Sequence, residues 1–126
     1  MSNLPALDAE ETTIAWLNTI LPTGWEASGD KPTGANTPAQ YVLVDRIGGP
    51  REAMVLDRAG ILIEVYHKTS RKSAKDVAMS IADQIPDMLL LSDNLTRASV
   101  NSVVNLEDTL AQYNRYQVYC DIYARR

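Results

Sequence analysis

The side chains that could carry out catalysis are few in this sequence and stand far apart. His67 is the only histidine and Cys120 the only cysteine. A histidine that acts as a base needs a substrate proton within hydrogen-bond reach, but His67 stands between an extended segment and a helix start, where a polar terminus is the more common role. Cys120 falls on the apolar side of an alternating segment, where a thiol behaves as a small apolar side chain. No histidine lies near it in sequence to activate it.

Two other patterns could hold a ligand, and both fail on spacing. Gly48-Gly49-Pro50 lacks the glycine spacing and the lysine of a phosphate-binding loop and does not open a helix, so it indicates a turn. One histidine, one cysteine and scattered carboxylates form no metal-ligand pattern. We therefore expect no catalytic residues, no cofactor, no metal site and no enzymatic activity.

Size and composition place the chain in a broad class. It has 126 residues, 45% of them hydrophobic and 22% charged, which is typical of one folded domain over residues 1–126. The net charge of -4 disfavours nucleic-acid binding, because such modules carry a basic stripe. A single cysteine fits a reducing cytosol. We see no signal peptide and no apolar run long enough for a membrane span, so we expect a soluble protein made in the cytoplasm.

The stretch from Gly60 to Leu91 organises the chain. Its first part alternates, with Ile61, Ile63 and Val65 on one face and Leu62, Glu64 and Tyr66 on the other. A period of two predicts a half-buried strand.

A period of three to four residues follows and predicts an amphipathic helix. Its apolar stripe consists of Ala74, Val77, Ala78, Ile81, Ala82 and Ile85. Ser70 or Ser73 would cap its start, and Asp76 stands where the carboxylate of a capping box would lie. Pro86 ends or kinks the helix at Ile85.

An earlier helix is predicted before this stretch. Asp8 and Glu11 have the spacing of a capping box. Pro22 ends the helix. Its apolar stripe consists of Ile14, Leu17 and Leu21, widened by Trp16 and Ile20. Residues 23–38 are interrupted by glycines and prolines and predict a flexible loop without an element of its own.

Three further strands complete the predicted fold: Tyr41 to Ile47, Ala98 to Leu106, and Arg115 to Ala124. Residues 51–59 form either a long hairpin arm or a packed loop, and Leu89 to Leu95 form an apolar tail to the second helix. The order helix-strand-strand-helix-strand-strand predicts an α+β fold. We expect a small four-stranded, mostly antiparallel sheet with two helices packed on one face. Such a sheet has two edges that must be protected or used.

The outer face of the last strand is unusual, because Tyr119 and Tyr123 alternate with Asp121 and Arg125. Ordinary cross-strand pairing on a solvated sheet explains this pattern. A protein interface explains it equally well, because tyrosine and arginine are enriched in interfaces. Glu64 and Tyr66 would extend the same face.

Several features, taken in order along the chain, resemble the tail terminator (tail completion) proteins of long-tailed bacteriophages. The resemblance runs from about Asp8 to Arg125. It rests on Arg46-Ile47-Gly48-Gly49, Val55-Leu56-Asp57, the strand Ile61 to Tyr66, Ser70-Arg71-Lys72-Ser73-Ala74, the strand around Val100 to Val104, Arg115-Tyr116 and Ile122-Tyr123-Ala124-Arg125. Residues 107–114 depart from the pattern, because relatives have a Pro- or Trp-containing segment there.

The resemblance implies a virion protein at the neck end of the tail, made in the host cytoplasm. It implies a homohexameric ring that caps the tail tube, ends tube polymerisation and joins the tail to the head connector. The implied partners are further copies of the chain, the tail tube protein, the head–tail connector or stopper, and the tape measure protein. DNA would pass through without specific binding. The predicted contact segments are 23–38, 51–59 and 107–114. The predicted interface residues are Arg51, Asp57, Arg58, Glu64, Tyr66, Glu107, Asp108, Arg115, Tyr119 and Tyr123.

Three alternatives stay open at this point. One is another neck protein, such as a head–tail stopper. A second is a small nucleic-acid-binding α+β module in which Tyr66, Tyr119 and Tyr123 stack on bases, although the acidic balance disfavours it. The third is a hydrolase or transferase that uses Glu64, His67 and Asp121, for which the sequence offers no motif.

Overall fold

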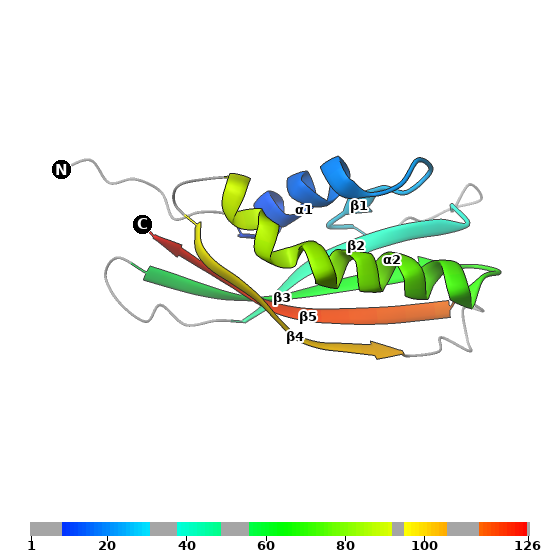
Figure 1. Ribbon diagram of the computed structural model, residues 1–126. Helices are drawn as coiled ribbons and strands as arrows, with labels where there is room; N and C mark the ends of the chain where they lie inside the picture. Colours follow the sequence, from blue (N-terminus) through cyan, green and yellow to red (C-terminus); the bar gives the residue numbers. More distant parts are fainter. Residues whose placement is uncertain (1–8, 31–37, 49–55, 92–94, 106–113, 126) are drawn as a thin grey trace.

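The computed structural model describes residues 9–30, 38–48, 56–91, 95–105 and 114–125, which form a five-stranded sheet with two α-helices on one side (Figure 1). The elements are α1 (Ala9–Ile20), β1 (Ala27–Ser28), β2 (Gln40–Gly48), β3 (Leu56–His67), α2 (Arg71–Gln84), the 3-10 helix η1 (Ile85–Leu91), β4 (Leu95–Asn105) and β5 (Asn114–Arg125). The predicted α+β class with two helices is confirmed.

The sheet has the strand order β1-β2-β3-β5-β4. The four long strands are antiparallel to their neighbours, and β1 pairs with β2 in parallel. The prediction of four strands was wrong, because β1 lies inside the segment that we expected to be a loop without an element. Two residues are too few to show a period. β1 is held instead by the Asn18 side chain of α1, which bonds both the N–H and the C=O of Ala27 at 2.9 and 3.2 Å.

β3 is longer than its alternating core predicted. Its first residues, from Leu56, pair with the end of β5, where Leu56 lies opposite Arg125. The hairpin-arm interpretation of 51–59 is therefore correct for 56–59, and residues 51–55 lie outside the described residues. β4 similarly begins at Leu95 rather than at Ala98.

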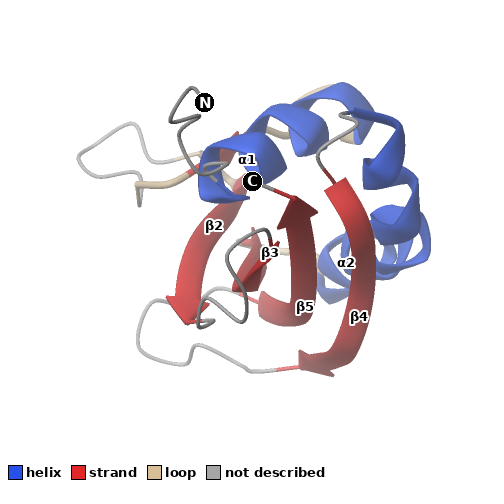
Figure 2. Cartoon of the chain, turned by 90° about the vertical axis from the view of Figure 1, so that its left-hand side faces the viewer, coloured by secondary structure: helices blue, strands red, loops and turns tan. Residues whose placement is uncertain are grey.

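The core lies between the sheet and the helices, and Figure 2 shows both helices on the same side of the twisted sheet. The predicted alternation is confirmed in β3 and β5. The sheet contributes the buried residues Val42, Val44, Ile61, Ile63, Val65, Val118, Cys120 and Ile122, and the helices contribute Trp16, Leu17, Ala74, Ala78, Ile81 and Met88. Cys120 is 1% exposed, as expected of a core thiol. Burial, with the charge of Asp121 adding to it, raises the pKa of this thiol to about 12.

The predicted facing of β4 is correct only for its first half. A register shift between Val100 and Ser102 inserts one residue relative to β5. Because side chains alternate between faces, one extra residue exchanges the faces of all that follow. Val103 therefore lies opposite Val118 on the core side, and Val104, expected to face inward, is 38% exposed.

The helix boundaries follow the predicted signals. Ser70 rather than Ser73 caps α2, and its hydroxyl accepts the N–H of Ser73 at 3.0 Å. Asp76 does not complete a capping box, because it binds Lys72 Nζ at 2.9 Å. α2 ends at Gln84, beside Ile85, and continues as η1 across Pro86. Asp8 lies outside the described residues. Within those residues, no helix has the length and apolar character that a membrane crossing requires.

Candidate interaction surface on the open face of the sheet

The face of the sheet away from the helices, which we call the open face, carries most of the polar side chains of the strands. The register assigns to it Tyr41, Leu43 and Asp45 of β2, Leu62, Glu64 and Tyr66 of β3, Arg97, Ser99, Ser102 and Val104 of β4, and Arg115, Gln117, Tyr119, Asp121 and Tyr123 of β5. All of these side chains stand on rigid strands, so their positions are fixed by the ladder rather than by loops.

Glu64 is the centre of a hydrogen-bonded network on this face. Its Oε2 accepts bonds from Tyr66 Oη at 3.2 Å and from Gln117 Nε2 at 3.1 Å. Arg115 Nη1 lies 3.4 Å from the same oxygen and forms an ion pair with it. The network continues to Tyr119, whose hydroxyl donates to Gln117 Oε1 at 3.3 Å. The carboxylate thus links two neighbouring strands through side chains as well as through the backbone.

The network is largely shielded from water. Tyr66 is 4% exposed and Gln117 9%. The side chains of Glu64 and Arg115 are 17% and 26% exposed. Burial raises the pKa of Tyr66; the hydrogen bond from Arg115 opposes this shift, and the charge of Glu64 reinforces it. Burial of an unpaired charge is costly, and the ion pair between Glu64 and Arg115 gives each of these side chains an opposite charge.

Tyr41 closes one side of the network. Its ring stacks on that of Tyr66 with centroids 4.7 Å apart and planes 18° apart, and the Arg115 guanidinium lies 5.9 Å from the Tyr66 ring centre. Such ring pairs contribute about 0.5–1.5 kcal/mol beyond their buried area. Tyr41 and Tyr66 therefore pack against each other on the sheet and do not project into solvent.

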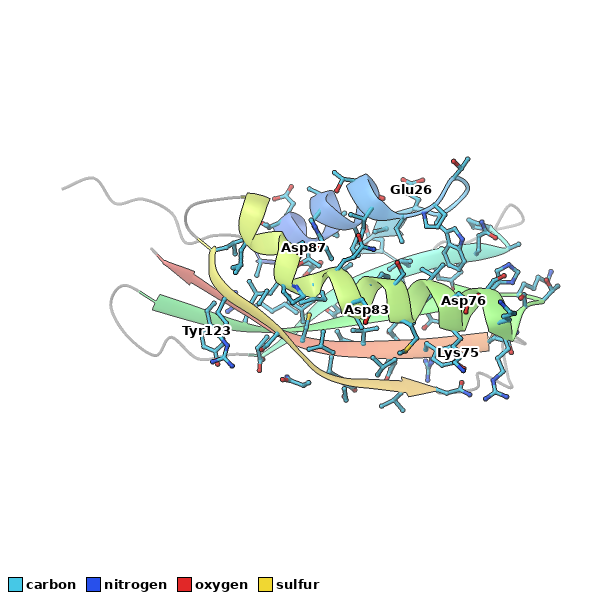
Figure 3. The ribbon with its side chains drawn as sticks, in the orientation of Figure 1. Glu26, Lys75, Asp76, Asp83, Asp87 and Tyr123 are labelled. Atoms are coloured by element: carbon cyan, nitrogen blue, oxygen red, sulfur yellow. The ribbon has the colours of Figure 1, made fainter. Side chains whose placement is uncertain are left out.

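A second group lies further along the open face. The Arg97 guanidinium of β4 lies over the Tyr123 ring at 5.7 Å, and Asn101 Nδ2 donates to Asp121 at 3.0 Å. Figure 3 shows Tyr123 near the opposite end of the molecule from Lys75 and Asp76 of α2. These contacts join β4 to β5, so the edge strand is tied to the sheet by its side chains.

The predicted interface residues divide into four groups. Glu64, Tyr66, Arg115 and Tyr119 belong to one network, and Tyr123 belongs to the second group. Asp57 and Arg58 lie on β3 opposite Ala124 and Tyr123, but their side chains are not described. Arg51, Glu107 and Asp108 lie outside the described residues. The contacts show cross-strand pairing, and the role of this face in an interface stays a prediction.

Tyr41, Gln117, Arg97 and Asn101 belong to these groups and were not among the predicted interface residues. A signal for Tyr41 was present, because it precedes the core residue Val42 and alternation alone places it on the polar face. Alternation with Tyr119 places Gln117 on the same face, but its bond to Glu64 depends on the pairing of β3 with β5. Arg97 could not be linked to Tyr123, because their pairing depends on the register shift between Leu95 and Arg97.

His67 has a structural contact that accounts for its position. Its Nδ1 accepts the backbone N–H groups of Thr69 and Ser70 at 3.1 and 2.9 Å, which shapes the turn into α2. Glu64, His67 and Asp121 do not converge. His67 lies level with Asn114, so Asp121 is seven positions away along β5 (121 − 114), or about 24 Å. Among the described residues, no group of three or more His, Cys, Asp or Glu side chains could hold a metal ion.

Comparison with known proteins gives a likeness in fold. No protein-family model and no curated protein matches the sequence. Among solved structures, a chain described as "Virion of native gene transfer agent (GTA) particle" is similar with a TM-score of 0.62 and 14% sequence identity. The match covers 94% of this chain and 87% of that chain. At this identity the likeness shows a shared fold over nearly the whole of both chains.

Proposed function

We propose that this protein is a structural virion protein, a tail terminator that forms a hexameric ring on the end of the phage tail tube. In this role it ends tube polymerisation and joins the tail to the head connector. The observation that carries the proposal is the likeness to a chain of a gene transfer agent virion, which extends over 94% of this chain. The ordered sequence features that resemble tail terminators support the same role independently.

The shape of the domain suits assembly into a ring. Identical subunits that meet head to tail form a closed ring when the rotation between neighbours fits. The open face offers tyrosine and arginine side chains held by a ladder, which is the composition of protein interfaces. The net charge of -4 suits a channel through which DNA slides, because DNA adheres to basic surfaces. The proposed partners are other copies, the tube protein, the connector or stopper and the tape measure protein.

The alternatives receive less support from the open face. A nucleic-acid module would need exposed rings for stacking, but Tyr66 is 4% exposed and packed against Tyr41. A head–tail stopper shares the virion location and differs in what it binds. The choice between stopper and terminator therefore rests on whether the protein binds tube ends.

The test has two stages. The first is the solution mass, by light scattering over a concentration series, with negative-stain imaging of the same samples. The second is addition of the protein to polymerising tail tubes, where a terminator shortens the tubes and is seen at one end. If the protein leaves the tube length unchanged and binds only connectors, the proposed role would change from terminator to stopper. Protein that binds neither would overturn the virion role.

A matched pair of variants tests the open face. Tyr123→Ala removes a partly exposed ring on this face, and Met79→Ala removes a more exposed side chain, 44% accessible, from α2. We expect Tyr123→Ala to weaken ring formation or tube capping and Met79→Ala to leave both unchanged. Equal behaviour of the two variants would contradict a contact on the open face without contradicting the capping role.

A further inference from the structure

The two edges of the sheet are both incompletely covered. The strand order places β4 last, and no described strand pairs with its outer side. Its backbone also makes no bond to a described turn or loop. At the other edge, β1 pairs only with Val42 and Leu43, so β2 has no described strand beside it from Val44 to Gly48. Among the described residues, each edge therefore has a stretch of backbone without a neighbouring strand, to which a further strand could be added.

β4 lacks several of the usual protections of a sheet edge, although its register shifts are one of them. Natural edges are short, or carry lysines or prolines that prevent pairing with another chain. β4 has 11 residues, with Arg97 as its one charged residue and without proline or lysine. Val104 is 38% exposed on it. The register shifts interrupt the strand near Leu95 and Val100 but leave it paired with β5 to Asn105.

The directions of the strands make the two edges compatible. β2, β3, β5 and β4 alternate in direction, so β4 runs antiparallel to β2 within one subunit. A rotation about an axis roughly along the strands leaves these directions unchanged. β4 of one copy would therefore meet β2 of the next copy antiparallel, which continues the existing pattern and gives the slightly more stable kind of ladder.

The unpaired stretches of β2 and β4 also lie at the same position along the strand direction, so that residues of the two strands connected through the register are level with each other. Through the register, Val44 is level with Val103, and Gly48 is level with Ser99. A second copy of this chain thus offers the strand direction and the position along the strands that this edge requires.

We propose that β4 of one copy pairs with residues 44–48 of β2 in the next copy, so that one continuous sheet runs through neighbouring subunits. The contact is head to tail and uses each edge once, so in a closed ring residues 44–48 and the part of β4 level with them are paired in every subunit. The ring itself rests on the proposed function, but the strand pairing is measurable without tail tubes.

Single cysteines test the pairing directly. The native Cys120 is buried and its pKa is raised to about 12, so it does not react with maleimides at neutral pH. Asp45 and Ser102 lie at the same level on the two edges and on the same face. Copies carrying Asp45→Cys are co-expressed with copies carrying Ser102→Cys, each with a tag of different size, and treated with a bis-maleimide. One reactive cysteine per copy excludes linkage within a chain.

We expect cross-linked pairs that contain one copy of each variant, and none from either variant alone. Co-expression of Asp45→Cys with Met79→Cys, which places the second thiol on α2, is the control and should give no product. Pairs formed by Ser102→Cys alone would show that β4 meets β4 and would overturn the head-to-tail contact. Absence of mixed pairs would overturn it as well, whether the sample is a ring or a monomer by light scattering.

A charged edge gives a second, independent readout. Lysines on an edge strand prevent strand addition, and Ser102 and Val104 are both exposed on β4. The double variant Ser102→Lys/Val104→Lys should weaken self-association at least tenfold, with a circular dichroism spectrum like that of the unchanged protein. Met79→Lys is the control and should assemble normally. A fully assembled double variant would refute the proposal. Mixed cross-links without tube capping would instead support the pairing and contradict the terminator role.

Discussion

Replacement of Glu64 by leucine should destabilise the protein strongly, although this side chain lies on the open face. Leucine retains the volume and removes the acceptor that Tyr66, Gln117 and Arg115 share. A hydrogen bond to a charged group contributes about 1.5–3 kcal/mol. The two bonds to Glu64, at 3.2 and 3.1 Å, together contribute about 3–6 kcal/mol. In the leucine variant, water can reach the 17% exposed site and replace part of the lost hydrogen bonding. We expect a loss of about 3 kcal/mol in the free energy of unfolding.

The assay is reversible denaturation followed by circular dichroism. For 126 residues the entropy of unfolding is about 0.26 kcal/mol per K, so this loss lowers the melting temperature by about 11 °C. The denaturant midpoint should fall at an unchanged slope, which indicates a change in stability alone. Asp83→Leu is the control, because Asp83 is an exposed carboxylate on α2. It should change stability by no more than about 0.5 kcal/mol.

A double-mutant cycle separates the ion pair from the rest of the network. Removal of one partner leaves the other charge half-buried, whereas removal of both leaves none. Glu64→Leu together with Arg115→Leu should therefore cost at least about 1 kcal/mol less than the sum of the two single changes. Additivity within about 0.5 kcal/mol would refute the view that these two side chains act as one unit.

Three further predictions concern single side chains. Cys120 should not react with thiol reagents at pH 8 until the protein unfolds. The pKa of the Cys120 thiol in the folded protein, about 12, is raised above its ordinary value. The contribution of the neutral thiol to the free energy of unfolding is therefore complete below about pH 9 and is lost as the pH rises towards 12. Denaturation at pH 8, 9.5 and 11 would measure this loss. His67→Ala should lower the free energy of unfolding by about 1–2 kcal/mol, because the backbone N–H groups of Thr69 and Ser70 lose their acceptor. His67→Asn should restore part of this stability, because an asparagine side chain can accept nearby backbone N–H groups. Equal losses in the two variants would contradict the role of Nδ1. Ser70→Ala should lower the free energy of unfolding by about 1 kcal/mol, and Ser73→Ala should lower it much less, because Ser70 caps α2. Denaturant midpoints measure both changes, and a larger loss for Ser73→Ala would contradict Ser70 as the cap.

Local pattern was sufficient to predict the long elements and, except in the second half of β4, the side of each that is buried. The alternation around Ile63 and the three-to-four-residue spacing around Ala78 each record one apolar face, and both residues are fully buried. The burial of Cys120 followed from its place in the β5 alternation. The cap at Ser70 was one of two options that the sequence offered, and geometry chose between them. These features depend on residues within a few positions of each other, so the sequence carries them directly.

Contacts between distant strands were decided by the tertiary structure. β1 exists because Asn18 of α1 satisfies the backbone of Ala27, and a two-residue strand leaves no periodic signal. The extra residue after Val100 reverses the faces of the second half of β4, which no alternation rule anticipates. Glu64 and Arg115 are 51 positions apart (115 − 64), and only the pairing of β3 with β5 makes them partners. Sequence determined which side of most elements avoids water, because burial follows from local periodicity wherever the register is unbroken. The tertiary structure determined which elements are neighbours and where the faces of β4 reverse, because strand pairing and register depend on the whole chain.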